Sequence, residues 1–256
     1  MTDIDIERVP RRTPLAVAAL AVAVVALVLL FLAGPGTRFG TWDFRMGFQI
    51  MRWAAYLGVA AAVLGIVALA LSHGRARWIA AAALLLGALA WFVPWNLRRE
   101  ARGYPPIHDI TTDTRNPPVF VAVVPLREGS PNPVEYEGEV IAAQQAKAYP
   151  DIRPLMLAMP VDSAFSLAVR AAREMGWELV DQDRRAGRIE ATATTGWFGF
   201  KDDVVIRVTS ASGISRVDVR SVSRVGKGDI GENARRIREY LERLRASDPN
   251  PIAETQ

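Results

Sequence analysis

Residues 15–34 read LAVAALAVAVVALVLLFLAG and lie within a longer stretch, 13–37, that contains no charged side chain. Two more charge-free stretches follow, at 53–74 and 78–97. A helix crosses the hydrocarbon core of a bilayer with about 20 apolar residues, and no water-soluble fold needs three such stretches in succession. The sequence therefore predicts three transmembrane helices, at about residues 14–34, 53–72 and 78–96.

The charges that flank these helices bear on their orientation. With the N-terminus inside, five arginines lie on the cytoplasmic side and six on the far side, so the count alone does not decide. Arg11 and Arg12 precede the first and most hydrophobic span, which favours an inside N-terminus. That span is longer than the apolar core of a signal peptide, about 7–15 residues, so we expect an uncleaved anchor. Three spans then place the C-terminal part outside the cytoplasm.

Charge is divided unevenly along the chain. Residues 1–97 contain 8 Lys and Arg against 4 Asp and Glu, and residues 98–256 contain 23 of each, so the net charge of +4 belongs to the membrane half. A nucleic-acid-binding domain would carry that excess itself, so nucleic acid is not expected as a partner.

The absence of cysteine excludes disulfides and thiolate chemistry. Arginine greatly outnumbers lysine, which indicates a GC-rich bacterial genome. We expect a multi-pass inner-membrane protein with a periplasmic C-terminal domain.

Composition divides the chain into four parts. Residues 1–97 form the membrane module, and residues 98–153 are rich in proline, which favours extended geometry. We expect this second part to be an extended spacer that packs partly on the domain, with a strand at VFVAVV, residues 119–124. Residues 154–246 form an α+β domain, and residues 247–256 form a disordered tail.

The periodicity of residues 161–245 predicts the fold of this domain. A helix is expected at 161–175 with Asp162 as its N-cap, and a second at 229–245 with Asp229 and Glu232 as a capping box. Four strand-like runs lie between them, each with one apolar face. Because each helix has one apolar stripe, we expect a mostly antiparallel sheet with both helices on one face, an arrangement of the helix-grip kind.

Several blocks of the globular half resemble a known family. They are PPIHDITTDTRNPPVF, YPDIRPL, MGWELVDQD, GRIEATATTGWFGFKDDVVIRV, SRVDVRSVSRVG and DIGENARRIREYL. Together they are similar to the uncharacterised bacterial and chloroplast family numbered 1499 among the domains of unknown function, over about residues 104–244. Bacterial members are often membrane-anchored, and the resemblance implies no activity, substrate or catalytic residue. The order of elements also resembles the helix-grip domains of the lipoprotein subunit of the outer-membrane barrel assembly machinery, a likeness of fold alone.

Three motifs with chemical potential have simpler interpretations. GKGDIG, residues 226–231, matches a dinucleotide fingerprint, but no second strand with an acidic residue follows it, so we interpret it as a turn. His108 with Asp109 and Asp113 could hold a divalent cation, or the histidine could be exposed or bonded locally. The adjacent Asp202 and Asp203 point to opposite faces of a strand and do not form an acid/base pair. We expect no catalytic residue, cofactor or metal.

Two sets of residues are candidates for binding. The turn TGWFGFKDD places Trp197, Phe198 and Phe200 between two strands, where they either close the end of the core or form a contact surface for a partner or lipid. The sheet face that points away from the helices carries a charged ladder. Its members are Arg188, Glu190, Thr192, Thr194, Asp203, Val205, Arg207, Arg216, Asp218, Arg220 and Arg224.

The ladder has two interpretations. One is a solvated face with cross-strand ion pairs, and the other is a site where unpaired Arg207, Arg216, Arg220 and Arg224 hold an anionic group. We expect a membrane-anchored, non-catalytic binding or assembly module of the bacterial cell envelope. Its partners are the lipid bilayer and an envelope protein or anionic lipid. Two alternatives stay open, namely a hydrolase-like or metal-dependent enzyme that uses the region of His108, and an accessory subunit of a transport or signalling complex.

Overall fold

The structure, a computed structural model, describes residues 13–248. Contacts divide the chain into two compact units. The helical unit comprises Met1–Ala101 with Trp197–Gly199, and the sheet domain comprises Arg102–Gly196 with Phe200–Gln256. Arg11 and Arg12, which support the predicted orientation, and residues 249–256 of the expected tail lie outside the described residues.

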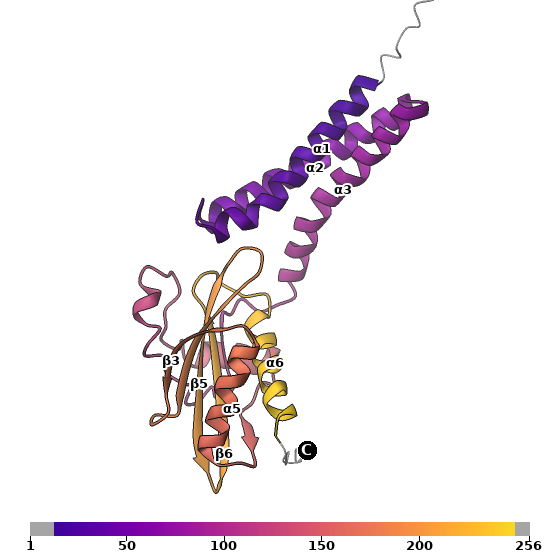
Figure 1. The fold of residues 1–256 in the computed structure, drawn as a ribbon. Coiled ribbons are helices and arrows are strands. Elements are labelled where there is room, and N and C mark those ends of the chain that lie inside the picture. Colours follow the sequence, from indigo (N-terminus) through magenta and orange to yellow (C-terminus); the bar gives the residue numbers. More distant parts are fainter. Residues whose placement is uncertain (1–12, 249–256) are drawn as a thin grey trace, which may run out of the picture. The chain divides into compact units, whose positions relative to one another are not determined.

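The helical unit contains the three expected long helices (Figure 1). They are α1 (Thr13–Arg38), α2 (Phe44–Leu71) and α3 (Gly74–Ala101), each long and apolar enough to cross a membrane. The second helix begins nine residues earlier than predicted because Asp43 caps it, accepting a hydrogen bond from the backbone N–H of Met46 at 2.8 Å.

Small residues line the contacts between these helices. The buried positions of α2 are Gly47, Ala54, Gly58, Ala61, Gly65 and Ala68. From Ala54 onward their spacing alternates between four and three, the pattern of a left-handed helix seam. A Cβ at Gly58 would lie 2.7 Å from the carbonyl oxygen of Gly87 in α3, so this approach requires glycine. Lipid offers no hydrophobic drive for helix association, and close backbone packing of this kind supplies the attraction instead.

The sheet domain is built on an antiparallel sheet, as predicted. Its strand order is β1-β6-β5-β4-β3, and β2 also pairs with β6. The strands are β1 (Asp109–Thr111), β2 (Leu155–Leu157), β3 (Glu178–Asp183), β4 (Arg188–Thr194), β5 (Lys201–Ala211) and β6 (Ile214–Ser223).

Two amphipathic helices cover one face of this sheet (Figure 1). They are α5 (Val161–Glu174) and α6 (Glu232–Ala246), which pack on the apolar face that includes Val204, Ile206 and Val208. The Tyr240 ring stacks on Trp177 with a centroid distance of 5.0 Å, and its hydroxyl donates to the Ala168 carbonyl at 2.9 Å. The predicted helix-covered face is therefore confirmed.

The helix caps differ in detail from those predicted. The N-cap of α5 is Pro160, and Asp162 lies in the first turn without capping it. The last helix begins at Glu232, three residues later than predicted, because Gly231 is the N-cap in a left-handed conformation with a φ of 75°. Asp229 still caps this helix, since its carboxylate accepts the backbone N–H groups of Gly231 and Asn233 at 3.0 and 2.7 Å.

The proline-rich part differs most from its expected form as an extended spacer. It contains β1, the 3-10 turn η1 (Pro125–Arg127) and α4 (Glu139–Ala148), and its first residues continue α3 to Ala101. Gln145 docks α4 by bonding to both the N–H and the carbonyl of Thr111, at 3.0 and 2.6 Å. These polar contacts make most of the segment part of the fold.

Residues 119–124 form no strand, contrary to the prediction. The backbone N–H groups of Val121 and Val123 each donate to the buried Glu190 carboxylate at 2.9 Å, so they do not pair with a strand. Phe120 and Val123 instead pack on Val205 and Val222, on the sheet face opposite the helices. We call that face the outer face, and residues 113–136, which supply these contacts, the covering segment.

Candidate functional site

The pairing register brings the predicted charged ladder together on the outer face. Glu190 lies opposite Val205, which lies opposite Arg220, and Arg207 lies opposite Asp218. One interpretation of the ladder required this face to be solvated, and the structure shows that it is not. The side chains of Glu190, Asp203 and Asp218 are almost fully buried because the covering segment lies over them.

Asp203 is the centre of one ion cluster in this ladder. Its carboxylate accepts from Arg127 of the covering segment at 2.7 Å, from Arg224 at 2.8 Å and from the Thr192 hydroxyl at 2.7 Å. Burial alone would raise the pKa of this carboxyl, but the bonds from Arg224, Thr192 and Arg127 hold the pKa below its usual value. Asp203 therefore stays ionised and cannot act as a general acid near neutral pH.

Asp218 is the centre of a second cluster. Arg207 and Arg216 approach its carboxylate at 3.0 and 2.9 Å. Asp113 of the covering segment adds a second carboxylate, 2.7 Å from Arg216 and 3.4 Å from Arg207. Both arginines are thus held between a sheet carboxylate and a loop carboxylate.

Arg220 has the most enclosed position of the four candidate arginines. Its guanidinium forms a bidentate pair with Asp109 at 2.7 and 3.0 Å and donates to the carbonyls of Pro118 and Val134. The rings of Phe120 and Tyr136 lie 5.2 and 5.4 Å from it. The second interpretation of the ladder, a site for an anionic group, required guanidinium groups without carboxylate partners, and each of the four has one. Their role in binding stays a prediction.

The candidate metal ligands do not converge. Asp109 pairs with Arg220 and Asp113 with Arg216, while the carbonyl of His108 accepts from Ser223 and Asn233. Residues 13–248 contain no group of three or more His, Cys, Asp or Glu side chains placed to hold a metal ion.

The aromatic turn lies outside the core of the sheet domain. Its backbone is closed by hydrogen bonds between Thr195 and Phe200, and the rings of Trp197 and Phe198 meet edge to face at 5.0 Å. Trp197–Gly199 group with the helical unit. Neither core cluster of the sheet domain includes these aromatic residues, so the turn does not close that core.

A buried polar cluster on the helix side was missed by the sequence analysis. Arg236 pairs with Asp202 at 2.6 Å and donates to the Ser221 hydroxyl, and Asn233 donates to Ser223 at 2.9 Å. The available signal was that Asn233 and Arg236 lie on the apolar stripe of α6, beside Ala234 and Ile237. A buried network of this kind joins the helix to the ends of β5 and β6.

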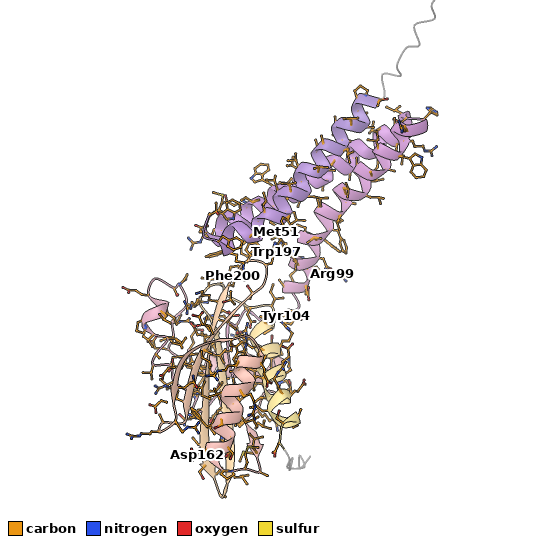
Figure 2. The ribbon with its side chains drawn as sticks, viewed as in Figure 1. Met51, Arg99, Tyr104, Asp162, Trp197 and Phe200 are labelled. Atoms are coloured by element: carbon orange, nitrogen blue, oxygen red, sulfur yellow. The ribbon has the colours of Figure 1, made fainter. Side chains whose placement is uncertain are left out.

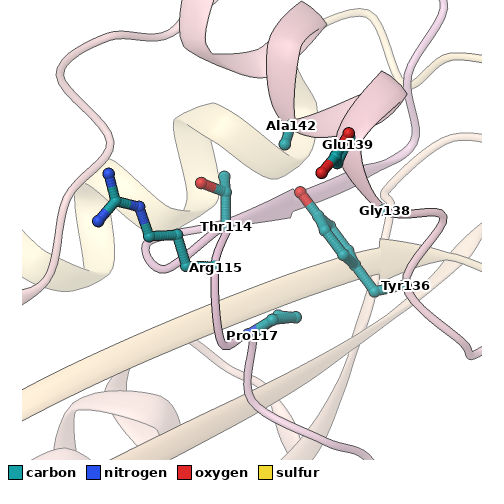
Figure 3. Close-up of a pocket in the computed structure, with 7 residues that line it drawn as sticks. All are labelled: Thr114, Arg115, Pro117, Tyr136, Gly138, Glu139 and Ala142. Atoms are coloured by element: carbon teal, nitrogen blue, oxygen red, sulfur yellow. The ribbon is translucent and has the colours of Figure 1, made fainter.

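A cavity of about 450 Å³ opens where the covering segment meets α4 (Figure 3). It is lined by Thr114, Arg115, Pro117, Tyr136, Gly138, Glu139 and Ala142. The Tyr136 hydroxyl is buried without a hydrogen-bond partner among residues 13–248, and Figure 3 shows it directed towards the start of α4. Burial, with a smaller contribution from Asp109, raises the pKa of Tyr136 to about 12, so the hydroxyl keeps its proton. None of the predicted site residues lines this cavity.

The part of the chain that holds the covering segment, the sheet and most of α6 matches a known family. A family described as a protein of unknown function, DUF1499, matches residues 109–244. The chain belongs to the DUF1499 family. The match begins at β1 and ends within α6, so the covering segment and its ion clusters belong to the DUF1499 domain. The curated proteins include no match to this chain.

Proposed function

We propose that this chain is a membrane-anchored, non-catalytic binding module of the bacterial cell envelope. The ion clusters of the outer face support this proposal. Asp109, Asp113, Asp203 and Asp218 each pair with arginine, and three of them are almost fully buried. A carboxylate held by guanidinium groups and closed to solvent is poorly suited to exchange protons with a substrate. We assign these residues a structural role, and we propose a cavity beside the covering segment as the place for a ligand.

The cavity favours a polar partner. Arg115 on its rim is exposed, and the partnerless hydroxyl of Tyr136 supplies a hydrogen-bond donor. Figure 3 shows Glu139 across the cavity from Arg115, where its carboxylate would oppose a purely anionic ligand. A peptide or headgroup with both charges satisfies the two walls, and a domain tethered to a membrane meets such groups at the envelope.

A photo-reactive amino acid placed at Arg115 tests this proposal in the full chain, expressed in bacterial cells. We expect one discrete adduct on illumination, whose mass identifies the bound protein or lipid. The matched control is Arg185, another exposed arginine, in the turn between β3 and β4, where we expect no adduct. Equal labelling at both positions, or none at either, would contradict a binding site at the cavity.

We also propose that the domain lies on the far side of the inner membrane. A fluorescent protein that matures only in the cytoplasm should be dark when fused after Leu244. The same reporter fused after His73, between α2 and α3, should fluoresce because that loop returns to the inside. The opposite pattern would reverse the topology.

A further inference from the structure

We propose that one end of the sheet domain, at which the chain enters from α3, binds the surface of an anionic bilayer. The entry surface consists of three apolar side chains, Tyr104, Leu126 and Ile230, and two basic ones, Lys201 and Lys227. This site is separate from the cavity and does not depend on the function proposed for it.

Contacts within the sheet domain bring these residues to one end. A Cβ at Gly231 would lie 2.5 Å from the Tyr104 ring, so the backbone that follows Ile230 lies against that ring. The Leu126 carbonyl accepts from Arg224 at 2.9 Å, and the Arg224 N–H donates to the carbonyl of Lys201 at 3.0 Å. Figure 2 shows Tyr104 and Phe200 at this end and Asp162 at the other.

The turn between β6 and α6 belongs to the same end. A Cβ at Gly228 would lie 3.2 Å from the Cα of Pro106, two residues beyond Tyr104, and Lys227 precedes Gly228. The side-chain amide of Asn132 donates to the Gly226 carbonyl at 2.8 Å, which ties the end of the loop after Leu126 to this turn. The GKGDIG turn, residues 226–231, thus contributes Lys227 and Ile230 to the entry surface.

The apolar side chains of this surface are exposed instead of joining the core. Relative exposures are 38% for Tyr104, 53% for Leu126 and 44% for Ile230. Ile230 has a φ of 55°, a left-handed conformation that is a genuine outlier for a β-branched residue. Asparagine or glycine would relieve the strain and expose less apolar surface. An exposed, strained isoleucine indicates a contact made outside the folded domain.

The basic residues point to an anionic bilayer as the occupant. The chain has three lysines, and two of them, Lys201 and Lys227, are exposed on this surface. Neither forms an ion pair within the described part of the chain. Apolar side chains beside free lysines suit a headgroup region with acidic lipids, which attracts cations close to the membrane. Tyr104 follows the last residue of α3 by three residues, which span at most about 10 Å, so the surface stays within reach of the bilayer.

The absence of cysteine allows a direct test in the full chain. Leu126→Cys and Ile230→Cys would each carry a fluorophore, and the protein would be placed in nanodiscs with or without anionic lipid. The control is Ser210→Cys, exposed near the opposite end of β5. Quenchers are attached to the lipid in one experiment and dissolved in water in another.

We expect lipid-attached quenchers to act severalfold more strongly on positions 126 and 230 than on position 210. This difference in quenching should become smaller in neutral lipid and in the variant with both Lys201→Gln and Lys227→Gln. Both lysines are exposed, so we expect the double variant to keep its fold. Quenching from water alone would overturn the proposal. Protection from both quenchers would mean that a protein or a second copy covers the surface, which also overturns it. A lipid signal that does not depend on anionic lipid would overturn the assignment of the headgroup charge.

Discussion

Arg220→Gln should destabilise the sheet domain by about 3–5 kcal/mol, because it leaves the Asp109 carboxylate buried without its cation. Arg220 and Asp109 are both almost fully enclosed, and the rings of Phe120 and Tyr136 lie 5.2 and 5.4 Å from the guanidinium. Arg216→Gln is the matched control on the same strand and face. We expect it to cost less than about 1 kcal/mol, because its side chain is 35% exposed and Asp218 keeps Arg207.

Urea unfolding of the full chain in nanodiscs, followed by pulse proteolysis, measures both free energies. A site that holds an anionic group on this face would require both substitutions to weaken binding while stability stays unchanged. Because Arg220 is enclosed and Arg216 is partly exposed, we expect the two variants to differ: only Arg216 can be changed without a large loss of stability. Equal and small losses for the two variants would show that the covering segment does not enclose Arg220.

The loss in Arg220→Gln should also depend on pH. Burial raises the pKa of Asp109 despite the opposing effect of Arg220, and removing Arg220 raises the pKa further. The folded variant then binds a proton more tightly than the unfolded chain. The contribution of Asp109 to stability is therefore greatest below the ordinary aspartate pKa and is lost as pH rises through the folded value. The variant should be closer to the wild type in acid than at neutral pH.

Gly58→Ile should separate α2 from α3 and cost about 3 kcal/mol of helical-unit stability, the upper part of the range for overpacking. A Cβ at this position would lie 2.7 Å from the Gly87 carbonyl oxygen and 3.0 Å from the Ala90 Cβ. The first of these atoms is backbone, so it cannot turn aside as a flexible side chain would. The helices must therefore move apart, which also removes the close contact around Gly87.

Ala60→Ile is the matched control in the same helix. Ala60 is exposed, so the added side chain meets lipid and should change stability by less than about 0.5 kcal/mol. An SDS titration in mixed micelles, followed by circular dichroism, compares the two midpoints. Equal midpoints would contradict the close approach of α2 and α3.

The sequence alone determined the features that depend on residues close to one another along the chain. The three spans follow from uninterrupted apolar stretches, which no other environment accommodates. The two faces of the sheet follow from strand alternation, which placed Arg207 and Asp218 on one face and Val204 and Ile206 on the other. The amphipathic stripes of α5 and α6 likewise predicted the layer that the helices form.

The state of the outer face was decided only by the tertiary structure. Proline-rich residues 98–153 carry no periodicity. The apolar run at residues 119–124 indicated that part of them packs on the domain, but nothing local indicated that this part covers the outer face of the sheet. Their contacts are instead made by single polar groups at long sequence separation, such as Asp109 with Arg220, 111 residues apart, and Arg127 with Asp203, 76 apart. The sequence pattern of a charged strand is the same whether its side chains face water or a buried counter-ion. Only the return of the covering segment removes water from these arginines and converts a predicted binding ladder into a buried ion-pair layer.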